Sequence, residues 1–140
     1  MFIGFILGIA STLACLYLTK FIVDPIINQA NYRYEIAAML KYYANVYTCL
    51  GDSTAEERQK AYEVFRGYGS WIESKTLAIR HYAFLSQLLR KPSLEDIKKV
   101  SGELIGLANS IKNGKGEEDK MNRERREKIL KLLSANSPEH

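Results

Sequence analysis

Two patterns of hydrophobic and polar residues divide the chain near residue 20. No charged residue occurs from Phe2 to Leu18, and Lys20 is the one charged residue in the apolar run that continues to Val23. A helix of about 20 residues rises roughly 30 Å, the thickness of a bilayer's hydrocarbon core. We therefore expect a transmembrane anchor over residues 1–23, with Tyr17 and Lys20 at its interfacial end.

After residue 24, apolar positions recur every three or four residues, as in helices with one buried face. Asp24-Pro25 predicts a junction, because aspartate is a good N-cap and proline suits a first helical position. The next helix is expected from Pro25 to Leu50, before Gly51; a nearly continuous helix kinked at Pro25 is the alternative. Its buried stripe should comprise Ile36, Leu40, Tyr43, Tyr47 and Leu50.

Capping patterns mark two further helix starts. Thr54 and Glu57 form a capping box, and Ser93 with Asp96 resembles another N-cap. The helix after Thr54 should bend near residues 70–75, because Gly67 and Gly69 weaken its middle. We expect its inward face to carry Tyr62, Phe65, Tyr68 or Gly69, and Ile72. The helix after Ser93 should bury Ile97, Val100, Leu104, Leu107 and Ile111.

No segment shows the alternation typical of strands. The last helix begins with acidic and ends with basic residues, which suits the helix dipole. We predict an all-α protein with one N-terminal transmembrane helix followed by a small helical bundle of about four helices. The boundaries are 1–23 for the anchor, 24–112 for the bundle, 113–116 for a loop, 117–133 for a C-terminal amphipathic helix and 134–140 for a flexible tail.

The opening segment has three interpretations. A cleaved secretory signal would have a basic start and a small-residue cleavage site, and neither is present. A lipoprotein leader would be lipidated at Cys15; Thr12-Leu13-Ala14 fits that pattern in part, but the apolar run continues to Leu18. The uncleaved anchor is favoured.

Basic residues Lys20, Arg33 and Lys41 follow the anchor, whereas only the α-amino group precedes it. The positive-inside rule then predicts an inner (cytoplasmic) membrane protein with its C-terminal domain in the cytoplasm. Cys15 and Cys49 are expected to lie too far apart for a disulfide. The cysteines are therefore compatible with a cytoplasmic location of the C-terminal domain.

Gly4, Gly8 and Thr12 form a row of small residues along the anchor. Glycines four residues apart let two helices approach closely in lipid, so this row is a candidate face for a homodimer. The alternative is that glycine is simply frequent in membrane spans.

Tyrosines crowd the helix after the anchor. At helical spacing most should belong to the core, and Tyr32 and Tyr34 are predicted to lie at the lipid headgroup level. An exposed remainder would form a patch for a protein partner. The segment 120–131 is basic and amphipathic, so Arg123, Arg125 and Arg126 are candidate contacts for anionic lipid. A solvated helix face is the preferred alternative, and a net charge of +4 without a recognisable motif argues against nucleic acid.

Nothing in the sequence indicates catalysis, a metal or a cofactor. His81 and His140 are the only histidines, and no metal-ligand spacing occurs. The pairs Glu56-Glu57 and Glu95-Asp96 occupy first turns of helices, where acids stabilise the dipole. We therefore expect a non-catalytic scaffold or adaptor that binds the lipid bilayer and another protein; the alternative is a periplasmic lipoprotein with a helical binding module.

Two stretches carry a resemblance: FIVDPIINQANYRYEIAAMLKYYANVY and PSLEDIKKVSGELIGLANSI. They resemble segments of a group of small uncharacterised bacterial proteins, single-pass in the membrane, that have an N-terminal span and a helical cytoplasmic domain. The resemblance implies this architecture and a bacterial source, and it implies no reaction.

Overall fold

The structure is a computed structural model that describes residues 2–114 and 118–134. Helices account for nearly all of this part of the chain, which contains no strand, so the predicted all-α class is confirmed. The elements are α1 (Phe2–Leu18), a π-helical segment (Thr19–Val23), α2 (Asp24–Tyr42), α3 (Ala44–Thr48), α4 (Ala55–Leu77), α5 (Tyr82–Leu88), α6 (Leu94–Asn113) and α7 (Asp119–Ser134).

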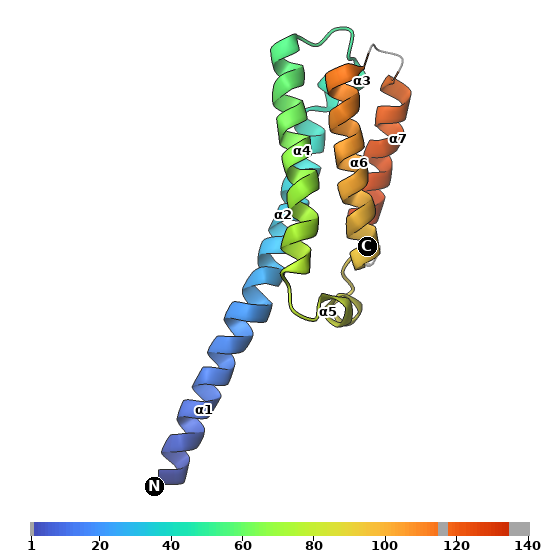
Figure 1. Cartoon of the computed structure of the whole chain (residues 1–140). Coiled ribbons are helices and arrows are strands. Elements are labelled where there is room, and N and C mark those ends of the chain that lie inside the picture. The colour runs from blue at the N-terminus through green and yellow to red at the C-terminus, as the bar shows by residue number, and fades with distance from the viewer. Residues whose placement is uncertain (1, 115–117, 135–140) are drawn as a thin grey trace.

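The long helices α2, α4, α6 and α7 lie side by side, and α1 projects alone from the start of α2 (Figure 1). The short helix α3 lies at the far end of this bundle, and α5 lies crosswise at the end from which α1 leaves. Because α3 and α5 are short segments beside long helices, the number of helices in the bundle is less clear-cut than the predicted four.

The anchor segment and α2 form one uninterrupted helix, which corrects the prediction of an N-cap at Asp24. The backbone of Asp24 is helical, with φ −58° and ψ −46°, and its N–H donates to the carbonyl oxygen of Thr19. This five-residue spacing is that of a π-helix, whose wider turn tolerates the missing N–H of Pro25 in the next position. The alternative prediction, a nearly continuous helix through Pro25, describes the structure better.

The predicted helix from Pro25 to Leu50 breaks at Tyr43, where φ is −91° and ψ is 15°. The hydroxyl of Tyr47, one turn beyond, donates to the carbonyl oxygen of Leu40 at 2.6 Å. This bond gives a polar partner to backbone beside the break. The predicted stripe is confirmed, since its members are buried apart from Tyr43, which is half-buried.

Helix α4 begins with the predicted capping box, since Thr54 and Glu57 exchange both bonds. The predicted bend near residues 70–75 is wrong: α4 runs unbroken to Leu77. Gly69 is buried against α6, where a Cβ atom would lie 2.8 Å from Ile105 Cγ1, and its carbonyl oxygen accepts a 2.7 Å bond from Ser101. Close packing against α6 therefore offsets the weak helix propensity of the glycines.

Helix α6 also begins with a capping box, formed by Ser93 and Asp96, and all five residues predicted for its inner face are fully buried. The C-terminal helix was predicted over residues 117–133. Residue 117 lies outside the described residues, and α7 begins at Asp119. Ile129 and Leu133 bury one face of α7. The buried Asn122 donates to the carbonyl oxygen of Tyr47 at 2.9 Å, which joins α7 to α3.

Helix α5 is held between two residues with left-handed backbone, His81 (φ 59°) and Arg90 (φ 49°). Arg90 ends α5 in a Schellman arrangement, in which the N–H of Lys91 donates to the carbonyl oxygen of Ser86 at 2.8 Å. Tyr82 faces inward: its hydroxyl accepts a bond from Gln29 at 3.2 Å and donates to the carbonyl oxygen of Pro92 at 2.7 Å. Since Gln29 belongs to α2, this buried link fixes α5 to the continuation of α1.

Candidate functional site

The apolar surface of α1 is the most exposed apolar region of the described chain. One helix, Ile3–Tyr42, is long and apolar enough to cross a membrane, with a mean hydropathy of 1.9 over its most apolar 18-residue window and no residue of that window buried. Ile3 is 75% exposed and Phe5 68%. Apolar side chains at such exposure are typical of a surface that contacts lipid or another protein.

The predicted interfacial residues Tyr17 and Lys20 lie at the end of α1 nearest the bundle. The ring of Tyr17 packs on Phe21, with 4.8 Å between centroids, and its hydroxyl accepts a 2.9 Å bond from the guanidinium of Arg80. Lys20 is exposed one turn further on. The Arg80 bond brings the loop between α4 and α5 to the end of the apolar segment.

Gly4, Gly8 and Thr12 share one exposed face of α1, as predicted from their spacing. A Cβ atom at either glycine would meet nothing within 4 Å, and the hydroxyl of Thr12 donates to the Gly8 carbonyl oxygen at 2.9 Å. This bond leaves the helix face without an unpaired hydroxyl donor. The proposed homodimer through this face stays a prediction.

The other two tyrosines predicted for the interface differ from each other. Tyr32 is half-buried and packs edge-on against Tyr68, with 5.0 Å between ring centroids, whereas Tyr34 is 74% exposed. Tyr32 follows Tyr17 by 15 residues, or about 22 Å along a helix. The structure thus gives Tyr32 a packing role in the bundle, and a headgroup position for either residue stays a prediction.

A groove of about 370 Å³ runs between α2 and α4. We call it the α2/α4 groove, and it is lined by Tyr32, Glu35, Glu63, Val64, Gly67, Tyr68 and Trp71. Trp71 is 58% exposed beside it. Aromatic residues with a polar rim are typical of surfaces that bind proteins. Trp71 does not stand out in the sequence, because only the packing of α4 on α2 places it beside the tyrosines.

Charge in this groove is negative and affects the tyrosines. The hydroxyl of Tyr68 donates to the carboxylate of Glu35 at 3.3 Å. Burial raises the pKa of Tyr32 to about 12, with smaller contributions from Tyr68 and Glu35. Lys75 lies over the Tyr32 ring at 5.4 Å, a cation–π contact at one edge. The groove therefore offers an apolar floor with carboxylates at its rim.

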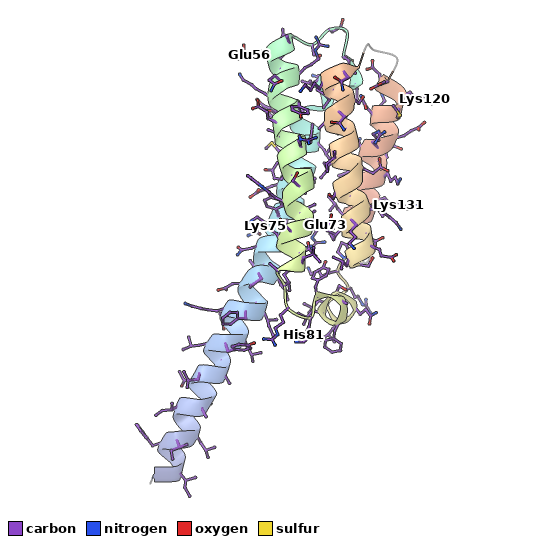
Figure 2. The ribbon with its side chains drawn as sticks, viewed as in Figure 1. Glu56, Glu73, Lys75, His81, Lys120 and Lys131 are labelled. Atoms are coloured by element: carbon purple, nitrogen blue, oxygen red, sulfur yellow. The ribbon has the colours of Figure 1, made fainter. Side chains whose placement is uncertain are left out.

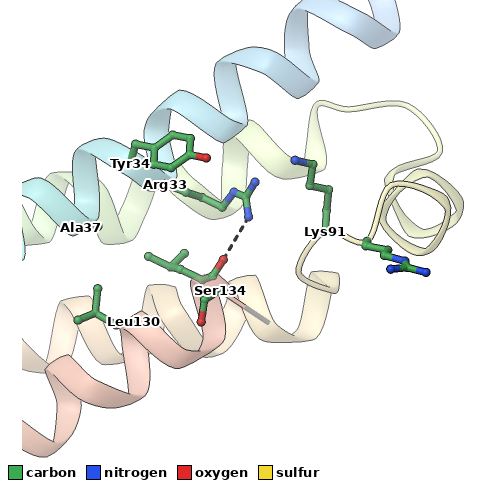
Figure 3. Close-up of a pocket in the computed structure, with 8 residues that line it drawn as sticks. Arg33, Tyr34, Ala37, Lys91, Leu130 and Ser134 are labelled. Carbon is green, nitrogen blue, oxygen red and sulfur yellow. Dashed lines mark hydrogen bonds between the residues drawn. The ribbon is translucent and has the colours of Figure 1, made fainter. Parts of the chain in front are cut away.

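A second, more polar pocket of about 240 Å³ lies between α2, the end of α7 and the loop after α5 (Figure 3). Its lining includes Arg33, Tyr34, Lys91 and Leu133. The Arg33 guanidinium donates to the carbonyl oxygen of Leu133 at 3.2 Å, and burial lowers the pKa of Arg33. Arg33 thus neutralises the carbonyl end of the α7 dipole, which is a structural role.

The arginines predicted to contact anionic lipid lie in the first half of α7. Lys120, at the start of this helix, is at the end of the bundle opposite His81, which lies near the exit of α1 (Figure 2). Arg125 pairs with Glu103 at 3.2 Å, and Lys128 pairs with the same carboxylate. The hydroxyl of Tyr47 neighbours Arg126, whose charge partly offsets the rise in the pKa of Tyr47 caused by burial. Lipid binding by Arg123, Arg125 and Arg126 stays a prediction.

The remaining polar candidates are dispersed. His81, just before α5, and Cys49, just after α3, are both exposed. The predicted pairs of carboxylates occupy first turns of α4 and α6. Residues 2–114 and 118–134 contain no group of three metal-ligating side chains. His140 lies outside the described residues.

Comparison with known proteins adds no relative. No family model matches the chain. No curated protein and no solved structure matches it either. The class defined by the structure is an all-α protein with one apolar helix able to span a bilayer, and the resemblance drawn from the sequence stays a prediction.

Proposed function

We propose that this chain is a single-pass membrane protein in which α1 is an uncleaved anchor and the following bundle of about four helices is a non-catalytic adaptor domain. The observation that carries the proposal is that α1 is apolar on all sides, unburied, and continuous with a helix of the bundle. Nine large aliphatic or aromatic side chains of α1 are exposed: Ile3, Phe5, Ile6, Leu7, Ile9, Leu13, Leu16, Tyr17 and Leu18. Transferring them from water to lipid would stabilise the chain by on the order of 10 kcal/mol or more.

In the proposed orientation the bundle lies on the cytoplasmic side of the inner membrane. Lys20 and Lys41 are exposed and flank the apolar helix on the bundle side, which agrees with the positive-inside rule. Reporter fusions test this orientation: a fluorescent protein fused after residue 140 should fluoresce, whereas a periplasmic phosphatase in the same place should be inactive. The reverse pair of results would contradict it.

The test of the anchor is extraction of membranes with alkaline carbonate. The full chain should remain with the membrane at its unprocessed mass, and a chain lacking residues 1–23 should be released. Release of the full chain, or a mature product that begins beyond Ala14, would refute the proposal. Labelling with a clickable fatty acid tests the lipoprotein alternative, because only lipidation at Cys15 would give a label that Cys15→Ser removes and Cys49→Ser keeps.

The adaptor role is proposed from the α2/α4 groove. A photoreactive amino acid at Trp71 should give a crosslink to one discrete protein in membranes, because this side chain is exposed beside the groove. Lys99, exposed on α6, is the matched control position. The crosslinked band should disappear when Tyr68 is replaced by Ala on the same chain. Equal crosslinking from Lys99 would contradict a dedicated partner surface in the groove.

A further inference from the structure

Helix α5 lies at the end of the bundle from which α1 leaves (Figure 1), and several of its apolar side chains are exposed. Phe84 is 65% exposed, Leu88 67% and Leu89 43%, and we call these three residues the α5 outer face. Phe84 and Leu88 are four residues apart and so share one side of the helix. Tyr82 and Ser86 are buried on the other side.

Hydrogen bonds link α5 and the loop before it to the apolar helix. Inside, Tyr82 is bonded to Gln29 of α2 and to the carbonyl oxygen of Pro92. Outside, Arg80 donates to the hydroxyl of Tyr17, in the last turn of α1, at 2.9 Å. A residue bonded to Tyr17 lies near the level at which the hydrocarbon core ends, if α1 spans the bilayer.

The charge of this region suits an anionic surface. Residues 74–94 contain no Asp or Glu but contain Lys75, Arg80, Arg90 and Lys91. Arginine and lysine beside exposed apolar side chains are typical of helices that lie in the interface of a membrane, where the cations attract anionic lipid headgroups.

We infer that the α5 outer face, with Arg80 and Arg90, lies in the headgroup region of the bilayer that α1 spans and forms a second contact with anionic lipid. The inference rests on the proposed anchoring function. Because α5 lies crosswise to the bundle at that end, this contact would set the bundle upright on the membrane. It places the lipid contact at the opposite end of the bundle from the basic start of α7.

Tryptophan fluorescence in lipid nanodiscs tests the inference on the full chain. Trp71 is the only tryptophan, and since it is 58% exposed, Trp71→Phe provides a background without tryptophan. Single tryptophans are then introduced by Leu7→Trp in α1, Phe84→Trp in the α5 outer face, and Gln59→Trp, exposed near the far end of α4. Each variant is measured in phosphatidylcholine–phosphatidylglycerol nanodiscs with and without phosphatidylcholine brominated near the headgroup end of its acyl chains.

We expect brominated lipid to reduce the fluorescence of Leu7→Trp and Phe84→Trp and to leave that of Gln59→Trp unchanged. Adding Arg80→Gln and Arg90→Gln to Phe84→Trp should lessen its loss of fluorescence in anionic nanodiscs. Fluorescence of Phe84→Trp that responds no more than that of Gln59→Trp, while Leu7→Trp is quenched, would overturn the inference and leave the anchor intact. A blue-shifted but unquenched Phe84→Trp would place protein there instead and would also overturn it. No quenching of Leu7→Trp would refute the anchor and, with it, this inference.

Discussion

The contact between α4 and α6 allows a paired test of the packing, because two glycines of α4 lie two residues apart in different surroundings. At Gly67 an added Cβ atom would meet nothing within 4 Å. At Gly69 it would lie 2.8 Å from Ile105 Cγ1, 3.1 Å from the carbonyl oxygen of Ser101 and 3.3 Å from the backbone nitrogen of Ile105. The side chain of Ile105 can rotate, but the two backbone atoms move only if α6 moves.

The expected free energies follow from two opposing effects. Replacing glycine by alanine inside a helix stabilises it by about 1 kcal/mol, and this gain applies at both positions. Overpacking at a tight helix contact costs about 1–3 kcal/mol, and this cost applies only at Gly69. Gly67→Ala should therefore raise the free energy of unfolding by about 1 kcal/mol, and Gly69→Ala should lie about 1–3 kcal/mol below Gly67→Ala.

The assay is thermal unfolding of the full chain in a mild detergent, followed by circular dichroism. For a bundle of this size, 1 kcal/mol corresponds to roughly 4 °C in Tm, so the two variants should differ by about 4–12 °C. Urea titration of the same samples supplies the free energies. Equal Tm values for Gly67→Ala and Gly69→Ala would refute the close approach of α4 and α6 at Gly69.

Three other predictions concern single side chains. Tyr47→Phe should lower the free energy of unfolding by about 1–3 kcal/mol, because it removes the buried hydroxyl bonded to the Leu40 carbonyl oxygen. In the same urea titration, Tyr42→Phe should change this free energy little, because Tyr42 is 76% exposed. Ser93→Ala should cost about 1 kcal/mol, because it removes the cap of α6; a Tm equal to that of the unsubstituted chain would contradict the observed capping box. The pKa of Tyr32 is about 12 in the folded chain and 10 for an ordinary tyrosine. Tyr32 should therefore stabilise the fold fully below pH 10 and lose that contribution as pH rises from 10 to 12. The Tyr32→Phe variant should thus lose less stability between pH 10 and 12 than the Tyr34→Phe variant, which keeps Tyr32. Parallel profiles of stability against pH would show that burial of the Tyr32 hydroxyl has no such effect.

The correct predictions from the sequence concern local features. The capping box at Thr54 depends on residues three apart, and the buried stripes of α2 and α6 depend on the helical repeat. Such features are fixed by neighbours in the sequence. The break at Tyr43 was missed because the hydroxyl that supports it comes from Tyr47, and the same tyrosines fit an uninterrupted stripe equally well.

Several other errors and omissions involve contacts between distant residues. A bend was expected in α4 from its glycines, but Gly69 is held by Ser101, 32 residues away. The orientation of α5 depends on the bond between Gln29 and Tyr82, which are 53 residues apart. The α2/α4 groove likewise requires Tyr32 and Tyr68 in contact. Spacing along the chain carries no information about these pairs, so Trp71 and the α5 outer face could not be identified before the fold was known.

The continuous helix from α1 into α2 has a consequence for the partner. The π turn carries the helix through Pro25 without a hinge. The bonds from Arg80 to Tyr17 and from Gln29 to Tyr82 tie α5 and the loop before it to both parts of that helix. In the proposed orientation the bundle therefore cannot swing freely about the end of its anchor.

The height of the groove above the membrane follows from this rigidity. Trp71 precedes the end of α4 by six residues, about 9 Å along the helix, and Tyr32 follows Ile22 by ten residues, about 15 Å. In the proposed orientation the α2/α4 groove would thus open sideways about 10–15 Å from the bilayer surface rather than toward the cytoplasm. In that orientation a segment bound in the groove would run close to the membrane. Its basic residues would face Glu35 and Glu63, and its apolar residues would cover Trp71. The proposed adaptor is therefore suited to the juxtamembrane segment of another membrane protein, since such segments on the cytoplasmic side are rich in lysine and arginine.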